Sequence, residues 1–296
     1  MKLKYVVKKD EHFDNIKEVL NTKFEISDRL LLKLKKNNLI FLNGSVANIK
    51  EPINSNDMVE ISLDYDEDNT NIVPVKMALK IVFEDDWLLI LNKPAGYPIH
   101  PSMLHFEDSI SNGVKYYFDS IKLHKKIRPV NRLDKDTSGI VIFAKNEYVQ
   151  ECLVRQMKQN EFVKEYIAVC CGKFDSLVGT VNAPISRKDG SIIERCVNQN
   201  GDYAVTHYDV VQSNSNMSVV HLRLDTGRTH QIRVHMSYLG HPIVGDTLYG
   251  TASDLINRQA LHSSSVTFYH PVTKQRLSFT APLFDDMNNL IKSMWK

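Results

Sequence analysis

The residues best suited to chemistry lie in RPVNRLDKDTSGIVIFAK, residues 128–145. A polar loop that carries Arg132 and Asp134 runs directly into the apolar segment 140–144, which has the composition of a buried strand. Side chains two residues apart in an extended segment project to the same side, so the guanidinium and the carboxylate share one face. Charged groups in a loop at the end of a strand are typical of catalytic sites. This stretch alone favours a simpler interpretation, a solvated surface ion pair.

A second cluster follows later in the chain, in LDTGRTHQIRVH at residues 224–235. The segment predicts a strand, a glycine turn and then a helix that Thr229 caps and that ends near Gly240. A helix N-terminus with Arg228 beside it is an arrangement that binds anions. Arg233 lies one turn into the helix and could point from this rigid element into the same cleft.

The histidines and cysteines do not predict a metal site. His230 and His235 are five residues apart, whereas two zinc ligands on one helix face need a spacing of four. Residues 1–13 lack the apolar core of a signal peptide, and no apolar stretch reaches membrane-spanning length. The sequence therefore predicts a soluble, cytoplasmic protein without a metal. The four cysteines lack CxxC spacing and are predicted to be reduced thiols; they are Cys152, Cys170, Cys171 and Cys196.

An aromatic side chain in the middle of the chain could contact a nucleic acid. Residues 162–172, FVKEYIAVCCG, predict a strand that places Tyr166 on one face with Phe162 and Lys164. An aromatic ring among charged neighbours can stack on a base. A single tyrosine in a strand is more often a core residue with its hydroxyl in water, and this interpretation stays open.

Any electrostatic attraction to a nucleic acid must be local, because the net charge of the chain is only +2. A basic run immediately precedes the loop of Asp134 and would suit a phosphate backbone. The alternative interpretation is a solvated loop. The run comprises Lys122, His124, Lys125, Lys126 and Arg128.

The 296 residues, 43% of them hydrophobic, are enough for one large domain and one small one. We expect a small α/β domain at residues 1–66, a linker at 67–75 and a catalytic domain at 76–296, because the acidic segment 64–74 ends in a proline. The small domain is predicted to contain a strand within 1–9, a helix at 28–36 capped by Ser27 and a hairpin at Asn43-Gly44. Its basic helix carries Lys33 and Lys36, which either contact RNA or form a solvated face.

Strands outnumber helices in the larger part and do not alternate regularly with them. This predicts an α+β fold with a mixed, mainly antiparallel central sheet. The expected helices span about 108–118 and 147–159, with one more at the C-terminus. The expected strands span 79–85, 87–94, 162–172, 203–211, 217–225, 260–270 and 275–280.

Together these segments resemble the RluA/RluD family of RNA pseudouridine synthases from about residue 75 to about residue 285. The similar motifs are NKPAGYPIHPS, NRLDKDTSGIVIFAKN, VKEYIAV and LDTGRTHQIRVHMSYLGHPIVGDTLYG. Four motifs in the same order are far more specific than any one of them. Residues 25–63 resemble, more weakly, the small RNA-binding domain named after ribosomal protein S-four. One departure is Asn131, where the family usually has His.

The resemblance implies that the protein converts uridine in RNA to pseudouridine without a metal, a redox cofactor or an energy source. It implies that Asp134 is the catalytic carboxylate, that Arg233 keeps it ionised and that Tyr166 stacks on a flipped uracil. Asn131 is expected to keep a hydrogen-bonding role. The RNA contacts expected from the resemblance and the basic patches are Arg132, Asn131, Lys125, Lys126, Arg128, Arg228, His230, Lys33 and Lys36.

The expected partner is RNA, with ribosomal RNA favoured and transfer RNA as the alternative, and the expected state is a monomer. Two other functions stay open at this point. One is a non-catalytic RNA-binding or ribosome-assembly protein that retains the fold, which Asn131 motivates. The other is a glycosidase acting on a small nucleoside, which would need a second carboxylate such as Asp136 beside Asp134.

Overall fold

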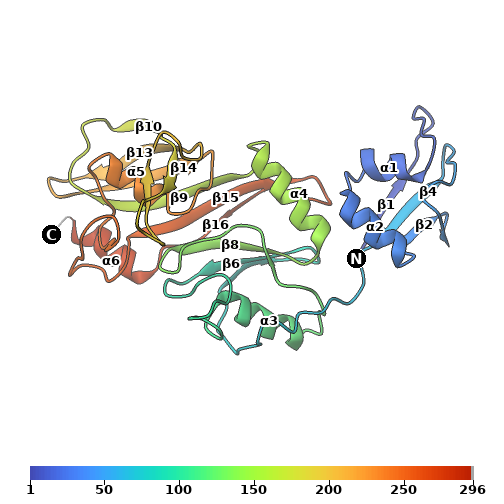
Figure 1. Cartoon of the computed structure of the whole chain (residues 1–296), viewed down its shortest axis with the longest axis horizontal. Coiled ribbons are helices and arrows are strands. Elements are labelled where there is room, and N and C mark those ends of the chain that lie inside the picture. Colours follow the sequence, from blue (N-terminus) through green and yellow to red (C-terminus); the bar gives the residue numbers. More distant parts are fainter. Residues whose placement is uncertain (295–296) are drawn as a thin grey trace.

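A computed structural model describes residues 1–294, which form two units with separate sheets (Figure 1). The N-terminal unit, residues 2–62, has a four-stranded antiparallel sheet in the order β1-β4-β2-β3 and two helices. Its elements are β1 (Lys2–Val6), α1 (Ile16–Thr22), α2 (Asp28–Lys36), β2 (Ile40–Leu42), β3 (Ser45–Val46) and β4 (Met58–Ser62).

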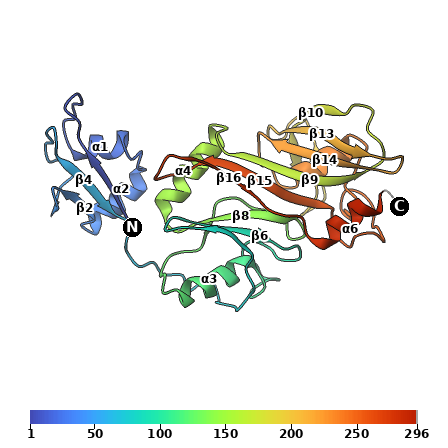
Figure 2. The same ribbon diagram turned by 180° about the vertical axis from the view of Figure 1, so that it is seen from behind.

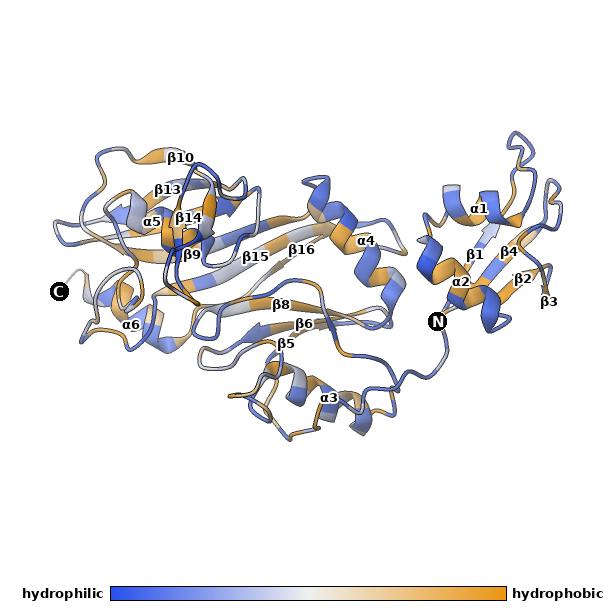
Figure 3. Ribbon diagram, viewed as in Figure 1, coloured by the Kyte–Doolittle hydropathy of each residue, from blue (hydrophilic) through white to orange (hydrophobic). Residues whose placement is uncertain are grey.

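Helix α2 and the hairpin after it form where local signals predicted them. The Ser27 hydroxyl accepts a hydrogen bond from the backbone N–H of Leu30 and thereby caps the helix. Leu30, Leu31 and Leu34 are buried, and hydrophobic and hydrophilic residues alternate around α2 (Figure 3). Asn43 and Gly44 both have positive φ, as a tight turn between β2 and β3 requires. Helix α1, which begins after the capping residue Asn15, was not predicted.

The central sheet has ten strands, and every pairing between them but one is antiparallel within residues 1–294. Its order is β10-β13-β14-β9-β15-β8-β6-β5, with β16 on β15 and β7 on β8. The predicted mixed, mainly antiparallel sheet is therefore confirmed. The strands are β5 (Ile81–Glu84), β6 (Leu88–Lys93), β7 (Arg128–Pro129), β8 (Ser138–Ala144), β9 (Val163–Cys171), β10 (Val178–Asn182), β13 (Val205–Ser213), β14 (Met217–Leu224), β15 (Leu261–Tyr269) and β16 (Arg276–Thr280). A separate two-stranded sheet pairs β11 (Ile185–Arg187) with β12 (Arg195–Val197).

The single parallel contact joins the two halves of the central sheet. Strand β15 pairs with β8 through only two residue pairs, His262 with Ser138 and Ser263 with Gly139. Gly139 has a φ of +112°, and a Cβ on it would lie 2.2 Å from the backbone oxygen of Ser263. Only glycine permits so close an approach here, so the start of β8 is fixed tightly against β15. The loop of Asp134 ends at this junction.

Strands β6 and β8 are buried on both faces. Their alternate residues pack into one core with helix α3 (Ile110–Ser120) and into a second core with helix α4 (Glu147–Lys158). Figures 1 and 2 show α4 between the central sheet and the N-terminal unit. The remaining helices are α5 (Gln231–Tyr238) and α6 (Asp285–Ser293). No helix in the described part of the chain combines the length and apolarity that crossing a membrane requires.

The segment predicted to be a linker, 67–75, is packed against the central unit. Residues 63–80 form no helix or strand. Ile72 is nevertheless buried in the same core as α3, and Asn69 is also buried. The carboxylate of Glu67 accepts two hydrogen bonds from the Arg128 guanidinium, at 2.7 and 2.6 Å. The acidic composition of this segment therefore reflects specific ion pairs and not only solvation.

Helices α2 and α4 hold the two units together. The Ser27 hydroxyl donates to Glu151 at 2.8 Å, and the Lys33 ammonium lies 2.9 Å from Glu147. Arg155 pairs with Glu25. Because these contacts run along the whole length of α4, they fix the N-terminal unit beside the central sheet.

Candidate active site

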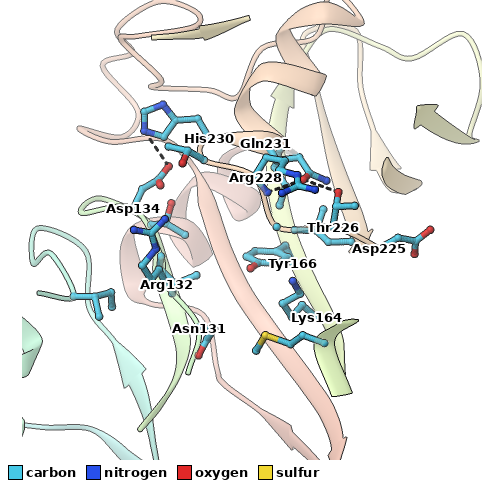
Figure 4. Close-up of a pocket in the computed structure, with 18 of the residues that line it drawn as sticks. Asn131, Arg132, Asp134, Lys164, Tyr166, Asp225, Thr226, Arg228, His230 and Gln231 are labelled. Carbon is cyan, nitrogen blue, oxygen red and sulfur yellow. Dashed lines mark hydrogen bonds and ion pairs between the residues drawn. The ribbon is translucent and has the colours of Figure 1, made fainter. Parts of the chain in front are cut away.

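A cleft of about 1160 Å³ opens across the junction of the two sheet halves. The parts of the chain that line it include the loop before β8, strand β9, the start of α5 with the loop before it, and the C-terminal half of α4; Figure 4 shows the first three. Asp134, Tyr166 and Arg233, which come from three of these parts, all face it. The structure thus brings together the three side chains expected to do the chemistry.

Asp134 pairs with Arg233 and not with its neighbour Arg132. Its Oδ2 lies 3.1 Å from the Nη1 of Arg233 and 3.9 Å from the Nε2 of His230. The carboxylate is 27% exposed, so it remains open to a ligand in the cleft. Arg132 is exposed at the same cleft.

Arg233 is held in place from behind by a carboxylate that sequence reasoning missed. The Nε and Nη2 of Arg233 donate to Asp246 at 2.7 and 2.8 Å, and Asp246 is fully buried. The backbone N–H groups of Leu248 and Tyr249 donate to the same carboxylate. Burial alone would lower the pKa of Arg233, but the charges and hydrogen bonds of Asp246 and Asp134 raise it. The guanidinium is therefore a fixed cation with Nη1 directed at Asp134. Asp246 lies within the long motif that ends at residue 250, which is the signal that could have identified it.

The predicted cap of helix α5 is wrong. His230 occupies the N-cap position with a left-handed φ of 58°, and no side chain caps the helix. Gln231 organises this loop instead, because its Oε1 accepts from the backbone N–H of Arg228 and from the Thr226 hydroxyl. Thr229, which was expected to cap, is exposed.

His230 and Arg228 take different positions around the cleft. His230 hydrogen bonds through Nδ1 to the Tyr249 hydroxyl at 2.8 Å, and burial lowers the pKa of His230. The Nε2 of the imidazole lies 3.9 Å from the Asp134 carboxylate. Arg228 is exposed, and its Nε donates to the backbone oxygen of Tyr203 at 2.9 Å.

Tyr166 belongs both to the core and to the cleft. It is 6% exposed within the core cluster of the central sheet, yet it also lines the cleft. Burial raises its pKa to about 12, so the phenol is protonated at neutral pH. A place in the core and a ring available to stack on a base are therefore compatible for Tyr166.

The loop that carries Asp134 is held by two buried cations. The Lys93 ammonium donates to the backbone oxygens of Pro94, Tyr97 and Lys135 at 3.0, 2.9 and 2.8 Å. Arg258 donates to the backbone oxygen of Asp136 at 3.2 Å and pairs with Asp286. The sequence patterns assigned no role to Lys93 or Arg258.

Asn131 lines the cleft but is almost completely buried. Its amide donates to the backbone oxygen of Ile140 and accepts from the backbone N–H of Ile142, both at 2.9 Å. A carboxamide offers a donor and an acceptor at once, so it satisfies both backbone groups of β8. The side chain therefore anchors the start of the loop to the strand. This is the structural hydrogen-bonding role that the sequence had left open.

Three of the cations expected to hold phosphates are bound by the protein itself. Lys125 is 4% exposed and donates to the backbone oxygens of Leu63 and Tyr65. Arg128 is also buried and pairs with Glu67, to which Lys33 donates as well at 3.0 Å. Lys125, Arg128 and Lys33 thus have acceptors within the protein, because the acidic segment after β4 returns alongside this basic run, and their contact with RNA stays a prediction. Lys126 and Lys36 keep exposed side chains.

The cleft has more cations than the sequence suggested. The acidic side chains that line it are Asp134 and Asp225. Sequence reasoning missed three of the cations because they are scattered through the chain. The cations that line the cleft are Arg132, Lys158, Lys164, Arg195, Arg228 and Arg233. Within residues 1–294, no three His, Cys, Asp or Glu side chains are grouped as metal ligands would be.

Comparisons with known proteins identify the family. The family model described as RNA pseudouridylate synthase matches residues 87–238. The RNA pseudouridine synthase YjbO of Bacillus subtilis is 40% identical over 268 residues, 90% of this chain and 95% of that protein. Ribosomal large subunit pseudouridine synthase D of Pasteurella multocida is 34% identical over 272 residues, 87% of this chain and 83% of that protein. Human RNA pseudouridylate synthase domain containing 1 shares the fold, with a TM-score of 0.59 and 24% identity, over 74% of this chain and 95% of that one. The chain therefore belongs to the RNA pseudouridylate synthase family and is an RNA pseudouridine synthase, an isomerase that modifies RNA.

Proposed function

We propose that this enzyme converts uridine to pseudouridine in large-subunit ribosomal RNA, with Asp134 as its catalytic carboxylate and without a cofactor. One observation carries the proposal: the Asp134 carboxylate lies 3.1 Å from the fixed guanidinium of Arg233, in a basic cleft that Tyr166 also lines. The ribosomal target is supported by relatives that are named for the large ribosomal subunit and are 34% and 36% identical to this chain.

The reaction is an internal rearrangement. The bond between uracil N1 and ribose C1′ breaks, the base turns, and C1′ joins C5 of the ring. The C5 proton leaves and N1 gains a proton, so atoms and electrons balance without an oxidant or a second substrate. The protein must supply a carboxylate at the sugar–base junction and must hold the free base, and the side chains in the cleft suit both tasks.

The target base must leave its stack before it can reach Asp134, and this costs a few kcal/mol, less in a loop than in a duplex. The exposed Arg132 at the cleft is suited to filling the space that the base vacates. Tyr166 offers a ring on which uracil can stack, since stacking is worth about 1–3 kcal/mol per base. RNA enters along the exposed cations of the cleft.

Arg233 gives Asp134 its orientation and places a positive charge 3.1 Å from the carboxylate. Asp246 binds the Nε edge of the guanidinium and so leaves Nη1 for the catalytic carboxylate. Such preorganised charges need not reorganise during the reaction, which is the main source of electrostatic catalysis. We expect loss of Asp246 to slow the reaction through Arg233.

The test replaces Asp134 by Asn in the full chain. We expect Asp134→Asn to lower the rate of pseudouridine formation by roughly 10³-fold or more, with RNA affinity within a few fold of wild type, because only the charge is removed. Product is measured in single turnovers on ribosomal RNA fragments. Folding is checked by thermal melting.

Mapping of pseudouridine in cells with and without the gene then identifies the target. A site in large-subunit ribosomal RNA that disappears supports the assigned substrate, and loss of a site in transfer RNA alone overturns it. Full activity of a folded Asp134→Asn protein would contradict the role of this carboxylate.

A further inference from the structure

Lys164 is a cation beside Tyr166 that the reaction as described does not use. It lies two residues before Tyr166 in β9, and alternation in a strand places both side chains on one face, roughly 7 Å apart along the chain. Both residues line the cleft, and Figure 4 shows Tyr166 between Asp134 and Lys164. Lys164 is only partly exposed, whereas Arg132, Lys158 and Arg228 are exposed.

The ammonium of Lys164 has no partner within the described part of the chain. Burial lowers its pKa, and no side chain of residues 1–294 forms a hydrogen bond or ion pair that would oppose this. The end of the side chain abuts the backbone at Gly227, where a Cβ would lie 3.2 Å from Nζ. The ammonium is therefore confined beside the loop that leads into α5.

Two buried lysines of this protein, both less exposed than Lys164, show how a desolvated ammonium is held. Lys93 donates to three backbone oxygens, and Lys125 donates to two. A desolvated charge without acceptors is costly, so buried lysines are found with partners. Lys164 lacks these acceptors, and it faces the cleft. Its cleft-facing side is therefore open to an acceptor that a ligand supplies.

Given the proposed function, we propose that Lys164 donates to a carbonyl oxygen of the flipped uracil and stabilises the anion that forms when the N1–C1′ bond breaks. The bonding pair stays on uracil in that step, and the negative charge spreads onto O2 and O4. A cation aimed at these oxygens interacts more strongly in the transition state than with the neutral base, which is what accelerates a reaction. It also helps to hold the free base while the base turns.

The position of Lys164 favours the base over a phosphate as its acceptor. A uracil ring stacked on Tyr166 lies on the same face of β9 and within reach of the next side chain along the strand. Phosphates are strongly hydrated and meet exposed cations first, and the cleft has several of these around it. Lys164 also has no carboxylate neighbour that would neutralise it.

The test compares Lys164→Met, Lys164→Gln and Lys164→Arg with wild type in the full chain, on an RNA that wild type modifies. We expect Lys164→Met to lower the single-turnover rate at saturating RNA by about 10²-fold, with the Kd for RNA changed less than about twofold. Lys164→Gln keeps a hydrogen-bond donor without the charge, so its single-turnover rate should lie between those of Lys164→Met and wild type. This variant remains informative if the methionine variant does not fold. Lys173→Met is the matched control, because this exposed lysine lies just beyond the end of β9 and outside the cleft. It should change neither quantity.

The pH dependence supplies an independent readout. Because arginine keeps its proton where the half-buried lysine loses it, Lys164→Arg should retain activity to higher pH than wild type. A wild-type rate in Lys164→Met overturns the inference. A variant that loses only RNA affinity also overturns it, if the slope of log affinity against log salt falls by about one phosphate contact. That result identifies Lys164 as a phosphate ligand. If wild type forms no pseudouridine in any RNA, that result alone contradicts the proposed function. The Lys164 variants test only the role of Lys164.

Discussion

Arg128 and Arg132 lie four residues apart in one basic stretch, yet they belong to two different electrostatic regions. Arg128 is buried in an interdomain clamp, which we define as Lys33, Lys125 and Arg128 with Glu67. Arg132 is exposed in the cleft and belongs to its set of cations. Neighbouring residues of the same type thus stabilise the fold in one case and face the ligand in the other.

Contacts distant in the sequence make this difference. Glu67 is 61 residues from Arg128 and Lys125 is 60 residues from Tyr65, so the segment after β4 supplies acceptors that no local pattern reveals. Burial alone would raise the pKa of Glu67, but the hydrogen bonds and charges of Arg128 and then Lys33 outweigh it and lower that pKa to about 2. A cation with such a partner is unavailable to RNA, whereas Arg132 has an open cleft before it.

The sharpest test of the comparison replaces each arginine by methionine. Arg128→Met removes two hydrogen bonds from the buried Glu67 carboxylate and leaves Lys33 to compensate its charge only in part, so we expect the free energy of unfolding to fall by about 3 kcal/mol. Affinity of the folded protein for RNA should be unchanged. Arg132→Met should change the free energy of unfolding by less than about 0.5 kcal/mol, because substitution of an exposed residue removes no buried contact. It should lower kcat/KM for RNA. Urea unfolding and single-turnover kinetics measure the two effects.

A double variant separates the ion pair from a general loss of packing. In Glu67→Leu/Arg128→Met both charges are removed, and much of the lost stability should return, because an apolar pair pays no desolvation penalty. If Arg128→Met instead keeps its stability and loses RNA affinity, Arg128 belongs with the cleft and the two regions are not distinct.

The fold was largely predictable because its signals are local. The Ser27 cap, the Asn43-Gly44 turn and the apolar run of β8 each depend on a few adjacent residues, and each lies where it was expected. Helix α1 is only seven residues long, and its amphipathic pattern is correspondingly weak. Alternation also identified β9, and with it the position of Tyr166.

The site was predictable in its central residues and not in their supports. Asp134, Tyr166 and Arg233 are carried by motifs, and the structure brings them to one cleft. Asp246 and Arg258 support the site through contacts that depend on how distant segments meet. The start of α5 shows the same limit. His230 has a left-handed backbone conformation there, whereas a cap at Thr229 would have required His230 to be helical.

Acid should weaken the clamp and leave the cleft cations charged. The folded pKa of Glu67, about 2, lies below its ordinary value of 4.5, so the stability it contributes is complete above pH 4.5 and is lost as the pH falls towards 2. Between pH 6 and pH 3 we expect the free energy of unfolding of wild type to fall by about 2 kcal/mol more than that of Glu67→Gln. Urea unfolding of both proteins at pH 6, 4 and 3 gives the difference. Parallel pH curves for the two would show that Glu67 is not the titrating group.

Lys36 provides the smallest and most specific test, because it extends the comparison into the N-terminal unit. Lys33 and Lys36 lie on the same helix, but Lys33 is paired with Glu67 and Glu147 while Lys36 is exposed. If the N-terminal unit contacts RNA, Lys36→Met should weaken RNA binding a few fold. It should also reduce the slope of log affinity against log salt by about one phosphate contact. Lys33→Met should lower thermal stability and leave that salt dependence as in wild type. Identical salt dependence in wild type and Lys36→Met would show that Lys36 does not contact RNA.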